Sequence, residues 1–283
     1  MFVVAFVLFL AMTFPFEMVA RRLEAEAQRN NIELSIGSLA LRGIGLRANQ
    51  VTLSTPGQAG PPLTFARVDL KPDLLPLLLG RTAFGFSLDG YGGTAHGHAR
   101  LSHDPKRPGL MSLQVEAQNL DLHAFPLPVP DAEIAGKLNL KLDLPVLQPL
   151  ELASGQGTLS IKGASLVRAV ARLEGGMTMT LPKASLGNVE ASFTLEKGAA
   201  KIEKLIAKGG DLDAEVDGTI ALRPALALSQ ADLHVKLRPG EKWLDLNPTL
   251  RAGLGFLGPR AGDGSYSVSL SGPLTRLQPR PGR

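Results

Sequence analysis

The stretch KLNLKLDL, residues 137–144, decides the fold of this chain because leucine alternates strictly with polar or charged residues. Successive side chains of a β-strand point to opposite faces of the sheet, whereas the faces of a helix repeat about every 3.6 residues. The polar residues of the stretch therefore share one strand face, and its leucines share the other. We predict a strand whose apolar face carries Leu138, Leu140, Leu142 and Leu144.

The same alternation recurs in both directions along the chain. A second apolar strand face carries Val189, Ala191, Phe193 and Leu195, and further alternating segments lie at residues 32–36, 111–115, 212–216, 233–237 and 266–270. Many of the 31 glycines and 21 prolines lie between these segments. The connections are too short for crossover helices, so antiparallel pairing is expected. Residues 17–30 are rich in strong helix formers and are expected to form a helix, and after Asn30 short helices are expected only at residues 73–79, 167–174 and 241–250.

These patterns predict a mainly β fold. We expect an elongated, curved or folded-over antiparallel sheet with an N-terminal transmembrane helix and a few short helices. A sheet with one apolar face has to shield that face from water, and few helices are available here. Three arrangements remain: a sheet that folds over and closes on itself, a sandwich, or an open curved sheet whose apolar face contacts lipid or a partner.

The N-terminal segment MFVVAFVLFLAMTFPF, residues 1–16, is uncharged and apolar, and it gives way abruptly to Glu17, Arg21 and Arg22. A helix of this length is about 24 Å long, which makes it a short membrane span. The segment has no basic residue ahead of it and no small-residue cleavage site, so we predict an uncleaved anchor. Arg21 and Arg22 alone predict the opposite orientation, so we expect a short basic leader upstream of Met1. A buried core helix is the alternative.

Composition excludes several classes of protein. The chain has no cysteine, so it has neither disulfides nor a zinc ribbon, and its 44% hydrophobic residues exclude intrinsic disorder. Its net charge is only +4, and the basic residues are scattered with few aromatics among them. We therefore expect no nucleic-acid partner, because neither an electrostatic platform nor a stacking platform is present.

Two glycine patterns are similar to dinucleotide-binding loops. GLGFLG contains Gly253, Gly255 and Gly258 and is followed at once by Pro259, whereas GIGLRA contains Gly43 and Gly45 and lies between strand-like segments. Neither opens a helix whose N-terminus could receive a pyrophosphate. We therefore expect loop glycines at both places, and no cofactor.

Two polar clusters contain side chains of the kinds that bind metal ions. His96 and His98 of the HGH triplet share a strand face, with His103 close by, but no further ligand follows at a short fixed spacing. The acidic residues of DLDAEVD, residues 211–217, also share a face, yet a flat strand does not wrap a calcium ion. We expect a solvated face in both cases, or an edge-protecting one for the acidic strand, and no metal.

The order of several segments is similar to a known family. LAMTFPFEMVARRLEAEAQ, NIELSIGSLALRGIGLRANQVTLS, VDLKPDLLPLLLGR, SLDGYGGTAHGHARL and the closing GDGSYSVSLSGPLTRLQPRP together resemble the type II secretion system protein GspN family in its deltaproteobacterial form. The family belongs to the broader AsmA-like group, whose members carry an inner-membrane anchor and an elongated periplasmic β-sheet. The resemblance covers essentially the whole chain and brings no catalytic residues with it.

The resemblance implies three regions: a membrane anchor helix at residues 1–20, a helical extension at 21–31, and a periplasmic AsmA-like β domain at 32–283. It implies a non-enzymatic, single-pass accessory subunit of a bacterial inner membrane, which contacts other secretion-system subunits. The alternative is a lipid-binding or lipid-transfer protein that holds acyl chains on its apolar sheet face. Either way the candidate groove or core face carries Leu138, Leu140, Leu142, Leu144, Val189, Phe193 and Leu195.

Overall fold

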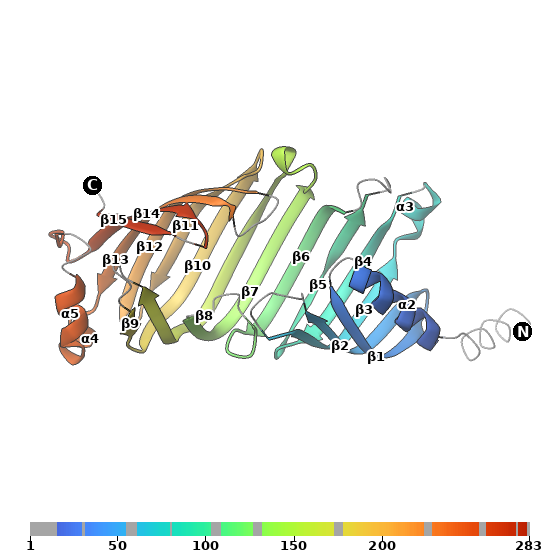
Figure 1. Ribbon diagram of the computed structural model, residues 1–283, viewed down its shortest axis with the longest axis horizontal. Coiled ribbons are helices and arrows are strands. Elements are labelled where there is room, and N and C mark those ends of the chain that lie inside the picture. Colours follow the sequence, from blue (N-terminus) through green and yellow to red (C-terminus); the bar gives the residue numbers. More distant parts are fainter. Residues whose placement is uncertain are drawn as a thin grey trace, which may run out of the picture.

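The fold is known from a computed structural model (Figure 1). The structure describes residues 16–29, 32–54, 61–79, 81–102, 109–126, 132–172, 178–223, 228–254, 259–275 and 277–281. The expected anchor, residues 1–20, thus lies outside the described residues except for its last five. No helix among the described residues is long and apolar enough to cross a membrane.

The described chain forms one 15-stranded antiparallel sheet in which strands follow one another in sequence order. The one exception is β9, which pairs only with β8. The other fourteen strands, which follow one another in order, are called the main path of the sheet. This confirms the prediction of a mainly β fold with antiparallel pairing. The strands are β1 (Glu33–Arg42), β2 (Gly45–Ser54), β3 (Leu63–Pro72), β4 (Ala83–Gly90), β5 (Gly93–Leu101), β6 (Leu110–Asp121), β7 (Ala132–Val146), β8 (Ser154–Arg172), β9 (Thr178–Leu181), β10 (Ala184–Glu196), β11 (Ala199–Lys208), β12 (Leu212–Ala221), β13 (Gln230–Pro239), β14 (Tyr266–Pro273) and β15 (Gln278–Pro281).

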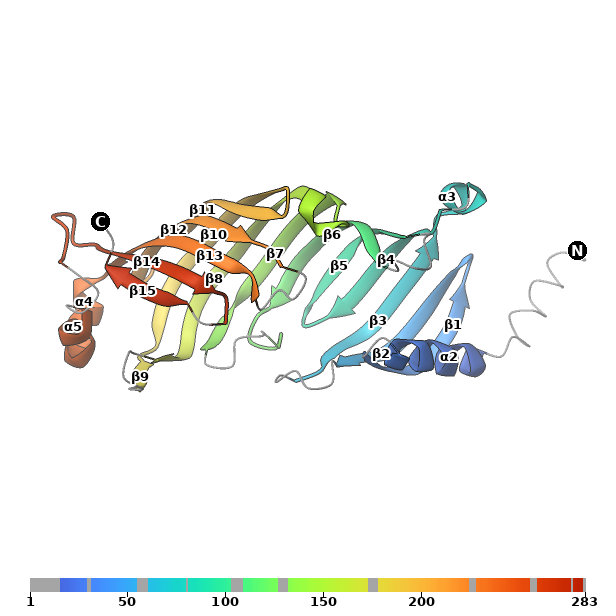
Figure 2. The same cartoon turned by 45° about the horizontal axis from the view of Figure 1, so that its top comes forward.

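Tight turns hold consecutive strands in register. Tyr91 and Gly92 between β4 and β5 both have positive φ angles, of 53° and 70°, and Lys197 and Gly198 between β10 and β11 have φ angles of 49° and 75°. Two successive positive φ angles define the type I′ turn, whose twist matches that of the strands it joins. The strand direction accordingly rotates steadily along the molecule, as Figures 1 and 2 show.

Both edges of the sheet are protected from pairing with other chains. Helix α2 (Phe16–Arg29) lies against β1, where Glu24 Oε1 accepts a hydrogen bond from the backbone N–H of Ile36 at 2.9 Å. The opposite edge, β15, has only four residues and two of them are prolines, Pro279 and Pro281. A covering helix and a short proline-containing strand are both common ways to block edge pairing.

The helices are few and short, as predicted. They are α3 (Leu74–Leu78), the 3₁₀ turn η1 (Leu150–Leu152), α4 (Glu241–Leu246) and α5 (Pro248–Leu254). Two of the expected helices are thereby confirmed, with a break at Asn247 inside the second. The helix expected at residues 167–174 is wrong, because β8 continues through this segment to Arg172 and pairs there with β9.

The described residues form a single layer. Strands contact their neighbours in the sheet order, and no second sheet or long helix among these residues packs across either face. Figure 2 shows α2 at the β1 end of the sheet and α4 and α5 at the opposite end. Of the three arrangements that the sequence left open, the structure therefore has the open sheet.

Candidate functional site: a continuous apolar face

Cross-strand pairing aligns apolar residues into rows that cross the whole sheet. The row that contains Leu140 is apolar on every strand of the main path, although the strands come from all parts of the sequence. Each residue lies directly opposite the next one on the neighbouring strand, so all of them share one face. The row is Leu39, Ala48, Val68, Leu88, Ala95, Ala117, Leu140, Leu159, Ala191, Leu205, Val216, Val235, Val268 and Pro281.

The adjacent row contains three glycines, and two of them are covered by phenylalanine rings. Gly97 lies opposite Phe86, and a Cβ atom built on Gly97 would lie 2.9 Å from Phe86 Cζ. Gly157 lies between Leu142 and Phe193, and a Cβ atom there would collide with the Phe193 ring. A ring that lies across a strand glycine shields backbone which has no side chain of its own. The apolar surface is therefore continuous across these glycines.

The seven residues predicted from the sequence all lie on this face, on β7 and β10. The two strands are not neighbours, because β8 lies between them and supplies Ile161, Leu159 and Gly157 to the same rows. Sequence reasoning overlooked the contribution of β8, although Leu159 and Ile161 alternate with polar residues. Leu144, Val189 and Leu195 are buried, whereas Leu138, Leu140, Leu142 and Phe193 are half-buried.

Two small clusters cover the apolar face locally. At the β7–β8 connection, Leu147 and Leu150 pack against Leu144 and Leu195. At the C-terminal end of the sheet, α4 and α5 pack Leu244, Leu250 and Leu254 onto Tyr266. Between these clusters no described element crosses the face. Among the described residues, the half-buried leucines there are shielded by their neighbours on the same face.

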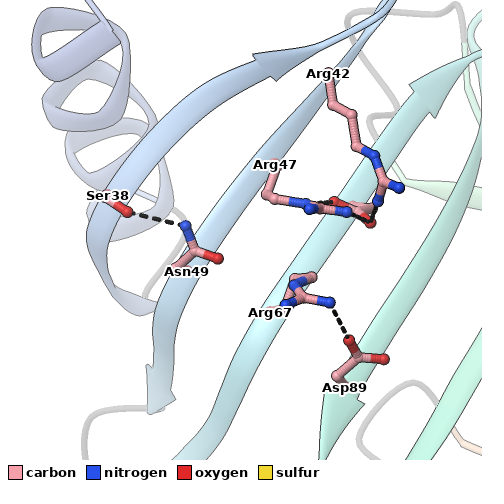
Figure 3. A network of polar contacts seen from close by, with 7 residues as sticks. Ser38, Arg42, Arg47, Asn49, Arg67 and Asp89 are labelled. Carbon is pink, nitrogen blue, oxygen red and sulfur yellow. Dashed lines mark hydrogen bonds and ion pairs between the residues drawn. The ribbon is translucent and has the colours of Figure 1, made fainter.

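The opposite face carries charged and polar side chains that pair across the strands. Asp69 accepts hydrogen bonds from Arg47 Nε at 2.6 Å and from Arg47 Nη2 at 2.7 Å, and a third from Arg42 Nη1 at 3.0 Å. One strand further, Arg67 binds Asp89 at 3.2 Å (Figure 3). Such cross-strand pairs are typical of a sheet face that contacts water.

The histidines of the HGH triplet lie on this polar face. His96 lies 4.0 Å from Glu116, and His98 lies 3.7 Å from Asp73. Within the described ranges no group of three or more His, Cys, Asp or Glu side chains could hold a metal ion. His103 lies outside the described residues.

The acidic strand DLDAEVD is also part of the polar face. Asp213 accepts a hydrogen bond from Arg238 at 2.7 Å, and Glu215 pairs with Lys208 at 3.6 Å. The hydrogen bond from Arg238 is the main reason that the pKa of Asp213 falls below its usual value. The edge-protecting role considered for this strand is wrong, because β12 pairs on both sides, with β11 and β13.

A shallow trough of about 560 Å³ crosses the polar face over β5 to β11. Two rows of polar side chains flank it, one of them containing His96, Glu116 and Lys141. Hydrogen bonds from Gln118 and Lys141 lower the pKa of the Glu116 carboxyl, which is therefore ionised at neutral pH. A carboxylate of this kind accepts hydrogen bonds and has no proton to donate as a general acid.

The expectation of loop glycines holds for Gly43 but is wrong for Gly253, which lies in helix α5, and Gly45 is the first residue of β2. Gly43 belongs to the β1–β2 turn and has a φ angle of 61°. Gly253 lies near the end of α5, whereas Gly255 and Gly258 lie outside the described residues. Neither Gly43 nor Gly45 opens a helix, so the β1–β2 turn lacks the anion site of a dinucleotide-binding loop.

The chain was compared with family models, curated proteins and solved structures. No family model, no curated protein and no solved structure matches this chain.

Proposed function

We propose that this protein binds lipid acyl chains along the apolar face of its sheet. The observation that carries the proposal is the row through Leu140, which is apolar on all fourteen strands of the main path and which a second layer of the described structure does not cover. Contiguous apolar surfaces without a covering layer are rare on soluble proteins and mark sites of interaction. Hydrocarbon is the ligand that such a surface accommodates without a hydrogen-bond partner.

The dimensions of the face suit this ligand. From Leu138 to Leu144 the four leucines of β7 span about 20 Å along the strand, which is comparable to the roughly 15 Å hydrocarbon thickness of one bilayer leaflet. Across the fourteen strands of the main path, thirteen spacings of about 4.8 Å extend over roughly 60 Å. The face therefore has room for several acyl chains laid side by side along the strands.

The accessory subunit of a type II secretion system is the second candidate. It rests on the resemblance to the GspN family, and three of the segments that carry this resemblance are adjacent at one end of the sheet. They form β1 and β2, then the end of β3 with α3, and then β4 and β5. In this proposal the chain is a single-pass protein of the bacterial inner membrane, and its sheet contacts other secretion subunits in the periplasm.

A photoreactive palmitic acid analogue tests the first proposal. The purified full-length chain is illuminated with the analogue, and the cross-linked peptides are identified by mass spectrometry. We expect cross-links on the apolar face, and a loss of about tenfold in Leu140→Asp and Phe193→Asp, the cost of roughly two buried CH₂ groups. The matched control is Thr158→Asp on the polar face, which should label like the wild type.

Circular dichroism of the same variants decides how a loss of labelling is interpreted. On an uncovered face the new aspartate stays in contact with water, so Leu140→Asp should keep the β-sheet spectrum of the wild type. Folded variants without cross-links support the proposal. Absence of cross-links from the wild type, or cross-links confined to the polar face, would contradict it. Cross-linking of the full chain to secretion subunits in the native cell is the corresponding test of the second candidate.

A further inference from the structure

The exposed aliphatic side chains of the described residues gather on one rim of the sheet. Alternate connections of an antiparallel meander share a rim, so the β1–β2, β3–β4, β5–β6, β7–β8, β10–β11, β12–β13 and β14–β15 connections lie together. Every strongly exposed large apolar side chain lies on this rim, apart from Met18, Leu23 and Ile32 near α2 and Leu246 on α4. The described part of the opposite rim has no counterpart to this concentration.

The concentration is highest at α3, in the connection between β3 and β4. Leu74, Leu75, Leu78 and Leu79 are all exposed there, with Leu78 at 84% and Leu75 at 74%. The turn is fixed by the carbonyl of Pro76, which accepts hydrogen bonds from the backbone N–H groups of Leu79 at 3.0 Å and Arg81 at 2.8 Å. Figure 2 shows α3 projecting from the sheet, so the leucines form a convex apolar knob.

Basic side chains surround this knob. Lys71, Arg81 and Arg100 are exposed, and none of them forms an ion pair with another described residue. A hollow of about 510 Å³ beside α3 is lined by Leu75 and Leu79 together with Arg81 and Arg100. The acidic residue in this hollow, Asp73, lies 3.7 Å from His98. Apolar and positively charged side chains therefore line the same hollow.

We propose that α3 and this hollow dock onto the surface of an anionic lipid bilayer, with leucines among the acyl chains and phosphate groups beside Arg81 and Arg100. Interfacial segments combine an apolar face with lysine and arginine in this way, and each basic residue adds attraction to an anionic surface. A protein partner fits less well. Protein–protein hot spots are enriched in tryptophan, tyrosine and arginine and poor in leucine, and the knob is convex and purely aliphatic.

The absence of cysteine allows a local test in the full-length chain. Leu78→Cys is labelled with an environment-sensitive fluorophore and mixed with phosphatidylcholine vesicles that contain or lack phosphatidylglycerol. The matched control is Leu246→Cys, which is 81% exposed on α4 at the opposite rim. We expect a blue shift and quenching by spin-labelled lipid for Leu78→Cys on vesicles with phosphatidylglycerol, and neither for the control. Because the readout is local, binding by any other segment does not mimic it.

The outcomes separate this proposal from the alternatives. Replacing Arg81 and Arg100 with glutamine should abolish the shift, and replacing them with lysine should preserve it. An equal shift on vesicles of phosphatidylcholine alone would overturn the proposal of an anionic surface. Docking would be overturned if the label at Leu78 stays in contact with water while the protein is bound to vesicles. It would also be overturned if a second copy of the chain shields the label in the absence of vesicles. The result is independent of acyl-chain binding on the sheet, which the palmitate cross-links measure separately.

Discussion

Substitution of Gly157 by alanine provides a sharp test of how the apolar rows pack. A methyl group at this position would collide with the ring of Phe193 and would lie 3.1 Å from Leu142 Cδ1. Overpacking of this kind typically costs about 1–3 kcal/mol in free energy of unfolding. For a domain of this size, about 2 kcal/mol corresponds to a melting temperature roughly 4–8 °C lower. Thermal unfolding of the full chain, followed by circular dichroism, measures the change.

Two further variants make the Gly157 result decisive. Gly262→Ala adds the same methyl group where nothing lies within 4 Å, so it should change stability by less than about 0.5 kcal/mol. Phe193→Leu shortens the side chain that covers Gly157, so the double variant should cost about 1 kcal/mol less than the sum of the two single changes. If Gly157→Ala is as harmless as Gly262→Ala, or if the two costs are additive, the ring does not lie across the glycine.

Two further predictions concern the polar face. Arg47→Met should lower the free energy of unfolding by about 1–2 kcal/mol, because it removes two hydrogen bonds from an Asp69 side chain that is only 14% exposed. Arg42 is 60% exposed, so Arg42→Met should lower the free energy of unfolding by between about 0 and 1 kcal/mol. Denaturant titration of both variants measures the two losses, and equal losses would refute this ranking. The pKa of Asp213 is lowered by its hydrogen bond with Arg238, so its contribution to stability is complete above the usual pKa of 3.8 and is lost as pH falls through the lower folded pKa. Asp213→Asn should therefore weaken the acid dependence of the melting temperature, and an unchanged dependence would contradict the pairing.

Much of the sheet could be predicted from local pattern. Alternation at Leu138–Leu144 and at Val189–Leu195 identified β7 and β10 because period two is a property of single strands. The segment after Val167 was misjudged as a helix, since VRAVAR contains strong helix formers. Its partners override that propensity: Ala169 pairs with Ala132 on one side and with Leu181 on the other. Strand pairing at such separations in sequence is invisible to a local pattern.

The α3 knob is a candidate site that a local sequence pattern also does not predict. The sequence predicted a short helix at residues 73–79, and the leucines of such a segment ordinarily pack inward. Whether they do depends on what lies nearby, and here the single layer offers no core at the rim to receive them. The basic residues of the hollow come from separate elements, with Arg81 before β4 and Arg100 on β5. Their proximity to α3 results from strand pairing and not from spacing along the chain.

By itself, the sequence of this protein determined that the fold is mainly β, which side of the clearly alternating segments is apolar, and that neighbouring strands run antiparallel. These properties follow from side-chain alternation and short connections, both of which act within a few residues. Only the tertiary structure decided that the described strands form one large sheet whose apolar face no second described layer covers. A sandwich and a single-layer sheet require the same alternation, because each strand presents the same apolar face in both. What covers that face depends on long-range packing between elements, which no local pattern encodes.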